Sequence, residues 1–140
     1  MDKIKAHRNL LIRRMLTALA VIAGGLTLRL TGYDIGLPYG LVKYGGSLLW
    51  GMMVFWVAGI LFPGLSVIRI ALIAGIIALL TEFSRLYHTP WLDEFRLQLV
   101  GALLLGRIFS WLNIVAYLAG IGLAALIEWR LVKKGPQLKA

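Results

Sequence analysis

The stretch LLWGMMVFWVAGILFPGLSVIRIALIAGIIALL, residues 48–80, decides the fold, because it places two long apolar blocks on either side of Pro63 and Gly64. A Pro-Gly pair favours a tight turn. A helix that crosses a bilayer needs about 20 mostly apolar residues, and each block approaches that length with its flanking small and polar residues. Backbone groups in lipid must be satisfied within the segment, so each block should be helical. The stretch therefore predicts an antiparallel pair of membrane-spanning helices.

The composition of the whole chain points the same way. Of its 140 residues, 60% are hydrophobic and only 15% are charged, and the mean hydropathy is +0.84. Roughly a quarter of the residues are charged in a typical soluble domain. Two further apolar blocks occupy residues 16–28 and 114–127. We therefore predict an all-α integral membrane protein, a single polytopic domain of residues 1–140, with an uncleaved first helix and four spans at about residues 10–30, 46–63, 66–84 and 111–131.

The formal net charge of +9 is concentrated near both ends of the chain. Basic residues that flank membrane helices mark the cytoplasmic side and contact lipid phosphates. We therefore expect lipid contacts rather than nucleic acid as the reason for the positive charge, and both termini in the cytoplasm. The basic residues counted toward the two ends are Lys3, Lys5, Arg8, Arg13, Arg14, Arg130, Lys133, Lys134 and Lys139.

Several chemistries find no support in the sequence. The chain has no cysteine, which excludes disulfides, thiolate nucleophiles and cysteine-bound metals. His7 and His88 fall on opposite sides of the predicted membrane, so they cannot share a metal ion. There is no phosphate-binding glycine loop, no HExxH and no GxSxG motif. We expect neither a metal nor a cofactor.

Two segments between and within the spans carry further predictions. The apolar run at residues 97–106 covers only about 15 Å as a helix, so we predict a short interfacial or re-entrant helix at about residues 94–107 on the outer side. In the last span, Ala116, Gly120 and Ala124 recur at every fourth position. This spacing lets helices approach closely; packing within the chain is the simpler interpretation, and a homodimer seam is the alternative.

The stretch TEFSRLYHTPWLDEFR, residues 81–96, is the most charged internal segment. Charges at a membrane edge are costly and usually have a partner or a role. Counting 1.5 Å per residue along the helices puts Arg29 and Glu82 at similar depth, so we predict a salt bridge between them. Glu128 lies at the other end, with Arg69, Arg130 or the Arg13/Arg14 pair as candidate partners.

Two interpretations of the outer charges stay open. They form a pocket for an anionic headgroup, since guanidinium groups bind phosphate or carboxylate bidentately, or they pair off and hold the loop in place. For the first interpretation we predict a ligand-binding set of Arg29, Glu82, Arg85, Asp93, Arg96 and Arg107.

The same residues carry a family resemblance. The segments at residues 82–87, 93–96 and 105–110, with the patterns Glu-x-x-polar-Leu-Tyr, Asp-x-x-Arg and Leu-Gly-x-x-Phe-Ser, resemble the family of small bacterial membrane proteins catalogued as domain of unknown function 2809. The resemblance covers nearly the whole chain, roughly residues 26–128. This sequence departs from the common family pattern at Asn113, where Asp is frequent, and at Arg85, where Gln is frequent. The resemblance implies a location in the bacterial cytoplasmic membrane.

The order of motifs is also similar, more distantly, to VanZ-like proteins, which are associated with glycopeptide resistance at the cell envelope. That similarity implies an envelope role. The main functional hypothesis is a protein that binds an anionic lipid or an envelope-precursor headgroup. The alternatives are a small membrane enzyme that uses Glu82, His88 or Asp93 as general acid or base, and an accessory subunit of a larger complex or homo-oligomer. A channel is disfavoured, because the predicted spans lack internal polar residues.

Overall fold

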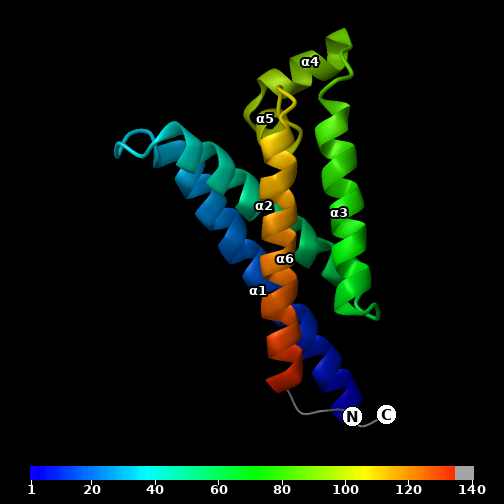
Figure 1. Cartoon of the computed structure of the whole chain (residues 1–140). Coiled ribbons are helices and arrows are strands. Elements are labelled where there is room, and N and C mark those ends of the chain that lie inside the picture. The colour runs from blue at the N-terminus through cyan, green and yellow to red at the C-terminus, as the bar shows by residue number, and fades with distance from the viewer. Residues whose placement is uncertain (135–140) are drawn as a thin grey trace.

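The computed structural model describes residues 1–134, and this part of the chain is helical with short connections (Figure 1). Lys139, counted above among the terminal basic residues, lies outside the described residues. The helices are α1 (Asp2–Thr31), α2 (Tyr39–Leu61), α3 (Val67–Ser84), α4 (Pro90–Leu97), α5 (Leu99–Leu104) and α6 (Trp111–Lys134).

Four of these helices, α1, α2, α3 and α6, are long and apolar enough to cross a membrane. This confirms the predicted all-α architecture with four long apolar helices. The largest difference from the expected boundaries is in α1, which already begins at Asp2. Hydropathy placed its start near residue 10 because the basic segment before it is polar, yet nothing in that segment breaks a helix.

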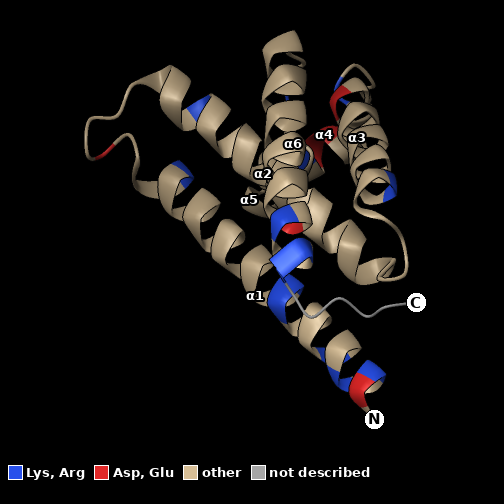
Figure 2. Cartoon of the chain, turned by 60° about the horizontal axis from the view of Figure 1, so that its bottom comes forward, with Lys and Arg blue, Asp and Glu red and all other residues tan. Residues whose placement is uncertain are grey.

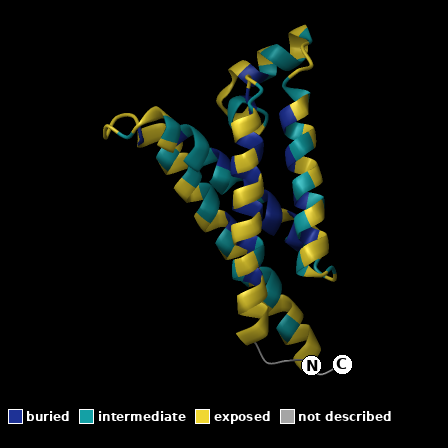
Figure 3. Ribbon diagram, in the orientation of Figure 1, coloured by how far each residue is buried: buried dark blue, intermediate teal, exposed yellow. Residues whose placement is uncertain are grey.

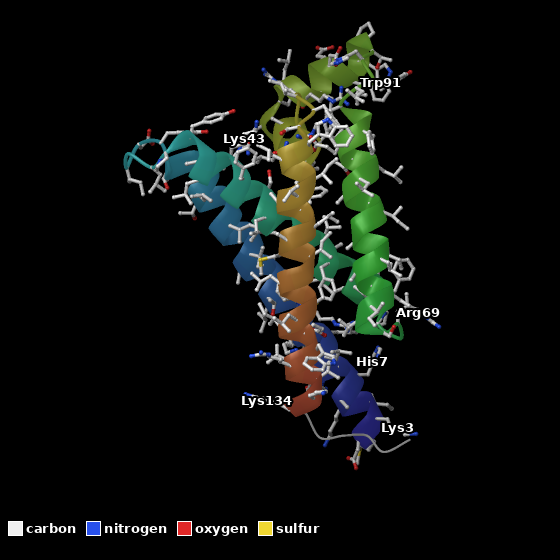
Figure 4. The ribbon with its side chains drawn as sticks, in the orientation of Figure 1. Lys3, His7, Lys43, Arg69, Trp91 and Lys134 are labelled. Atoms are coloured by element: carbon white, nitrogen blue, oxygen red, sulfur yellow. The ribbon has the colours of Figure 1, made fainter. Side chains whose placement is uncertain are left out.

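The four long helices form a bundle around α2 and α6. Helix α6 packs against both α2 and α3, and α1 packs against α2. The beginning of α1, Arg69 near the start of α3, and Lys134 all lie toward one end of the bundle, which we call the N-terminal end (Figure 4). Trp91 lies at the opposite end, which we call the α4 end, where α4 and α5 cover the ends of α3 and α6 (Figures 1 and 4).

The turn between α2 and α3 contains Pro63 and Gly64, as the sequence indicated, and Ser66 caps the N-terminus of α3. The Ser66 hydroxyl accepts a hydrogen bond from the backbone N–H of Arg69, which satisfies one of the donors that the first helical turn leaves free. The predicted antiparallel hairpin is present, since α2 and α3 pack against each other.

The segment at residues 94–107 does not form the single short helix that was predicted. It contains the end of α4 and the whole of α5, separated at Gln98, whose backbone is extended (φ −74°, ψ 152°). The two helices fold back on each other so closely that a Cβ at Gly101 would lie 1.9 Å from the backbone oxygen of Phe95. Because of this break, Arg96 and Arg107 do not share a continuous helix.

Many large apolar side chains lie on the outside of the bundle, and several polar and charged side chains are buried inside it. Leu72, Ile76 and Leu80 of α3 are exposed, whereas α2 carries much of the buried surface (Figure 3). The buried polar residues are Arg14, Ser47, Glu82, Arg96, Asn113 and Glu128. This distribution suits a protein surrounded by lipid, in which an exposed apolar residue carries no penalty and a polar group needs a protein partner.

Small residues set the contact between α2 and α6. A Cβ at Gly120 would lie 2.0 Å from the backbone oxygen of Leu48, and a Cβ at Gly51 would lie 2.5 Å from that of Tyr117. Gly120 and Ala124 are both buried in this interface. The predicted close approach of helices through this spacing is confirmed as packing within the chain.

Gly120→Ala should lower the free energy of unfolding by roughly 3 kcal/mol, the upper range of overpacking costs, because the added methyl group meets backbone that cannot move aside. Gly122→Ala is the matched control, since a Cβ there meets nothing within 4 Å. It should leave stability unchanged or raise it by up to about 1 kcal/mol. Thermal and denaturant unfolding in the same detergent measures both; equal stability of the two variants would contradict the close packing.

Candidate functional site

Glu82, at the end of α3, is the centre of a buried polar network at the α4 end. Its side chain is completely buried, and Oε2 lies 3.0 Å from Nη1 of Arg85. Oε1 accepts hydrogen bonds from the backbone N–H of Ser110 at 2.7 Å and from Nδ2 of Asn113 at 3.2 Å. The network therefore ties α3 to the start of α6. Glu82 is paired with Arg85 and not with Arg29, so the predicted salt bridge was wrong.

Arg85 uses its remaining donors to hold the connection between α5 and α6. Nε donates to the backbone oxygen of Leu105 at 2.6 Å, Nη1 to that of Ile108 at 3.1 Å, and Nη2 to the hydroxyl of Tyr117 at 2.8 Å. Gly106 lies between these two carbonyls with φ +68°, and a Cβ there would lie 2.5 Å from the guanidinium group. A glycine is needed for both reasons. One guanidinium group thus fixes the position of the loop that follows α5.

Arg96 is also a structural residue by its contacts. It is 1% exposed, and its guanidinium group donates to the backbone oxygens of Tyr87 and Ser84 at 2.8 and 2.6 Å and lies 3.3 Å from Asp93. It thereby closes the turn between α3 and α4. Its side chain is too deeply buried to meet a ligand directly.

Beside this network, two adjoining cavities form one cleft between α1, α2, α5 and α6. The first, of about 250 Å³, is mostly apolar, and the second, of about 350 Å³, is the more polar of the two and is lined by four basic side chains. Arg29, Ser47, Arg85 and Ala102 line both cavities, so the two adjoin each other. We call this the amphipathic cleft. Arg29 of α1 and Arg85 at the end of α3 therefore line the same cleft.

Among the described residues, the polar half of the cleft is lined by four basic side chains and by no acidic one. The basic residues are Arg29, Lys43, Arg85 and Arg107. The Arg29 side chain reaches across α2, where a Cβ at Gly46 would lie 3.6 Å from its Nη1. Lys43 Nζ lies 5.6 and 5.2 Å from the ring centroids of Tyr39 and Tyr44, in the range of cation–π contacts. In Figure 4, Lys43 lies in the half of the molecule toward the α4 end.

Comparison with known protein families identifies relatives of this chain. The model described as "Protein of unknown function (DUF2809)" matches residues 37–121. The chain belongs to this family. No solved structure matches the chain. The more distant similarity to VanZ-like proteins stays a prediction.

The matched part of this DUF2809 protein contains the Glu82 network in full. Residues 37–121 run from just before α2 into α6 and include Arg85, Ser110, Asn113 and Tyr117. Helix α1, which contributes Arg29 to the cleft, lies outside the match. The polar network and the two short helices therefore belong to the family domain, and α1 completes the cleft from outside it.

The three candidate catalytic residues do not converge in the structure. His88, in the turn between α3 and α4, and Asp93, in the first turn of α4, form an exposed pair at 3.0 Å, with side chains 62% and 46% exposed. Glu82 is buried and has its contacts with Arg85, Ser110 and Asn113. The described residues contain no group of three or more potential metal ligands. The carboxylates of Glu82 and Asp93 therefore have separate partners.

A second buried ionic cluster lies toward the N-terminal end. Glu128 of α6 is completely buried, with Oε1 2.9 Å from Nε of Arg14 and 3.0 Å from Nη2 of Arg13. Its Oε2 accepts a hydrogen bond from Nε1 of Trp56 at 3.3 Å, and Arg14 also donates to the backbone oxygen of Gly59. Of the partners proposed for Glu128, the Arg13/Arg14 pair is confirmed. This cluster joins α1, α2 and α6. Basic residues surround it on α1 and α6 (Figure 2).

Sequence reasoning missed the polar residues inside the helices of the network. The spans were taken to lack internal polar groups, yet Ser47 and Asn113 are buried and lie 3.2 Å apart between Oγ and Oδ1. Lys43 and Tyr117 were likewise absent from the predicted ligand-binding set. The signal was present in the sequence, because an Asn early in an apolar helix needs a partner in lipid.

Glu82→Gln should lower the free energy of unfolding by about 3 kcal/mol, because Arg85, whose side chain is only 11% exposed, would keep its charge without a counter-ion. Glu94→Gln on exposed α4 surface is the matched control and should change stability by less than about 0.5 kcal/mol. Denaturant unfolding in detergent measures both changes. A Glu82→Gln protein as stable as the control would show that the ion pair does not hold this end together.

Proposed function

We propose that this protein binds an anionic amphiphile in the amphipathic cleft, with the apolar chain in the first cavity and the charged headgroup in the second. The observation that carries the proposal is that an apolar cavity adjoins a cationic one through four shared lining residues. Ligand sites are typically concave, mostly apolar and provided with a few converging polar groups. An amphiphile is the class of molecule that requires both halves at once.

The apolar half matches a lipid chain. Its lining includes Val21, Ile22 and Leu26 of α1, Leu49 and Met53 of α2, and Val100, Leu103 and Leu104 of α5. Leu26, Val100 and Leu104 are also exposed on the surface of the bundle. A chain lying there would enter from the surrounding lipid without crossing a polar barrier.

The cationic half matches the headgroup, but with a smaller set of residues than the sequence indicated. Arg29 and Arg107 line it, and Lys43 joins them. Arg85 forms its wall, with most of its donors used within the protein. Glu82 and Arg96 support the site from buried positions, and Asp93, at the start of α4, pairs with His88. We therefore propose Arg29, Lys43 and Arg107 as the residues that contact the headgroup.

The distribution of basic residues supports an orientation for this activity. Lysine and arginine gather at the beginning of α1 and the end of α6 (Figure 2), which by the positive-inside tendency favours a cytoplasmic location for that end. We propose a multi-pass protein of the bacterial cytoplasmic membrane with the cationic half of the cleft facing the outer leaflet, which agrees with a role in the envelope. An enzyme acting on the bound lipid, and an accessory subunit, are the alternative hypotheses. In the enzyme hypothesis, Glu82 and Asp93 would not act together as general acid and base, because the two carboxylates have separate partners. Other residues would have to supply the second group.

Arg29→Gln should weaken binding of phosphatidylglycerol to the purified protein by about tenfold, the effect of losing roughly 1.4 kcal/mol of a charge-assisted contact. Arg8→Gln makes the same chemical change on the exposed surface of the same helix near its other end, and should leave the affinity unchanged. Phosphatidylcholine should bind weakly to all three proteins. Native mass spectrometry of lipid titrations in detergent gives the affinities.

Two results would overturn the proposal. One is equal retention of phosphatidylglycerol by the Arg29→Gln and Arg8→Gln proteins, which would remove the cleft as the site. The other is equal binding of phosphatidylglycerol and phosphatidylcholine by the unmodified protein, which would remove the requirement for an anionic headgroup.

A further inference from the structure

The charges of the amphipathic cleft define its ligand more closely. We propose that the preferred ligand has a single apolar chain and a terminal phosphate group with about two negative charges, rather than a phosphodiester with one charge. The inference rests on the proposed function, since it concerns the same cleft. It depends on a count of compensated and uncompensated charges and on the sizes of the two cavities.

Within residues 1–134, three of the four cations in the polar half lack a counter-ion. Arg85 is neutralised by Glu82 at 3.0 Å. Among the described residues, no carboxylate lies within 4.0 Å of the charged nitrogens of Arg29, Lys43 or Arg107. No acidic residue lines either cavity. An excess of about three positive charges thus faces the space in which the headgroup would lie.

A phosphomonoester matches this excess better than a phosphodiester. It carries a charge of about −1.5 to −2 at neutral pH and presents three acceptor oxygens, whereas a phosphodiester carries one charge and leaves two cations without a partner. The potential of several like charges adds up in a concave site with apolar walls. The second negative charge should therefore gain more here than it would at an isolated surface arginine.

The side chains of these cations are already oriented by contacts within the protein. Lys43 lies between the rings of Tyr39 and Tyr44. Nε of Arg107 lies 3.5 Å from the backbone oxygen of Arg96, and the Arg29 side chain lies along α2 beside Gly46. Side chains with restricted rotamers lose less entropy when they bind a headgroup. The hydroxyl groups of Tyr33 and Tyr39, both in the lining, add neutral donors.

The apolar half limits the ligand to one chain. A cavity of about 150 Å³ is filled by one benzene molecule, so a cavity of about 250 Å³ holds a short segment of a single chain. In the adjoining cavity, four basic side chains favour the headgroup over a second apolar chain. The rest of the chain would leave between α1 and α5, past the exposed side chains of Leu26, Val100 and Leu104.

Three lysolipids with the same oleoyl chain test the charge requirement. Lysophosphatidic acid carries a phosphomonoester, lysophosphatidylglycerol a singly charged phosphodiester, and lysophosphatidylcholine no net charge. The intact protein in a neutral detergent is titrated with each, and native mass spectrometry gives the affinities. We expect lysophosphatidic acid to bind roughly five- to tenfold more tightly than lysophosphatidylglycerol, the equivalent of one additional partly screened ion pair. Lysophosphatidylcholine should bind most weakly.

Variants show whether the preference arises in the cleft. The ratio of the affinity for lysophosphatidic acid to that for lysophosphatidylglycerol measures the preference. Lys43→Gln and Arg107→Gln should each lower the logarithm of this ratio by at least about half, because fewer cations remain for the second charge. Arg8→Gln should keep the ratio. Size-exclusion elution and helical circular dichroism check that each variant is folded. A ratio unchanged in both cleft variants would overturn the inference.

Further titrations distinguish a lipid phosphate from free phosphate, and a lipid with one apolar chain from a lipid with two. Inorganic phosphate and pyrophosphate, at the concentrations at which lysophosphatidic acid saturates, should not displace it, since they lack the chain; displacement by either would show a site for free phosphate and overturn the amphiphile. Phosphatidic acid with two oleoyl chains should bind no more tightly than lysophosphatidic acid. Tighter binding of the two-chain lipid would overturn the single-chain requirement.

The failure of this inference is distinguishable from the failure of the proposed function. If lysophosphatidylglycerol binds as tightly as lysophosphatidic acid and both depend on Arg29, the protein binds anionic lipids but the charge requirement is wrong. If neither depends on Arg29 while Arg8→Gln behaves like the unmodified protein, both proposals fall together.

Discussion

The structure at the α4 end depends on the burial of one carboxylate, that of Glu82. A charged group taken out of water loses several kcal/mol of solvation, and only close partners restore it. The Glu82 side chain, with no exposed surface, has an arginine, a backbone N–H and an amide N–H around it. Because these partners come from the end of α3 and the start of α6, the two helices cannot separate here without exposing the charge to lipid.

The partner of this carboxylate then shapes the cleft. Arg85 has five N–H donors, and Glu82 uses only part of them. The others hold the carbonyls of Leu105 and Ile108 and the hydroxyl of Tyr117, so the loop after α5 takes its position from the same guanidinium group. Among the described residues, α5 packs against no helix other than α4. The wall that α5 contributes to the cleft is thus held mainly through Arg85 and through the fold of α4 onto α5.

The features of the fold that were predictable from the sequence are those that depend on a single segment of the chain. The length and apolarity of a span belong to one segment, so the four long helices and the turn at Pro63 and Gly64 were predictable. The spacing of Gly120 and Ala124 is local too, and it placed the close contact correctly. The break at Gln98 depends on the backbone of one residue and on how tightly Gly101 packs against Phe95. No pattern of apolar residues encodes such a break.

The predicted pair of Arg29 and Glu82 failed for a different reason. Counting residues along a helix gives depth, and both residues do lie toward the α4 end. It does not show toward which neighbouring helix a side chain points. In the described chain, α1 and α3 are not packed against each other. The Glu82 carboxylate instead pairs with Arg85, which follows it by three residues and caps the end of α3. Arg29 was left to face the cleft.

The shortage of acidic residues explains why cations remain uncompensated in that cleft. The chain has 6 acidic residues against 15 lysines and arginines. Glu82 and Glu128 are committed to buried pairs, and Asp93 contacts Arg96 and His88. A protein that needed Arg29 and Lys43 only as supports would be expected to give them carboxylates or carbonyls, as it does for Arg85 and Arg96. Arg107 has one long contact of this kind, 3.5 Å from the backbone oxygen of Arg96, and no carboxylate among the described residues. Mutual repulsion of like charges beside an apolar cavity is a cost to the folded state, and a bound anion is the simplest way to offset it.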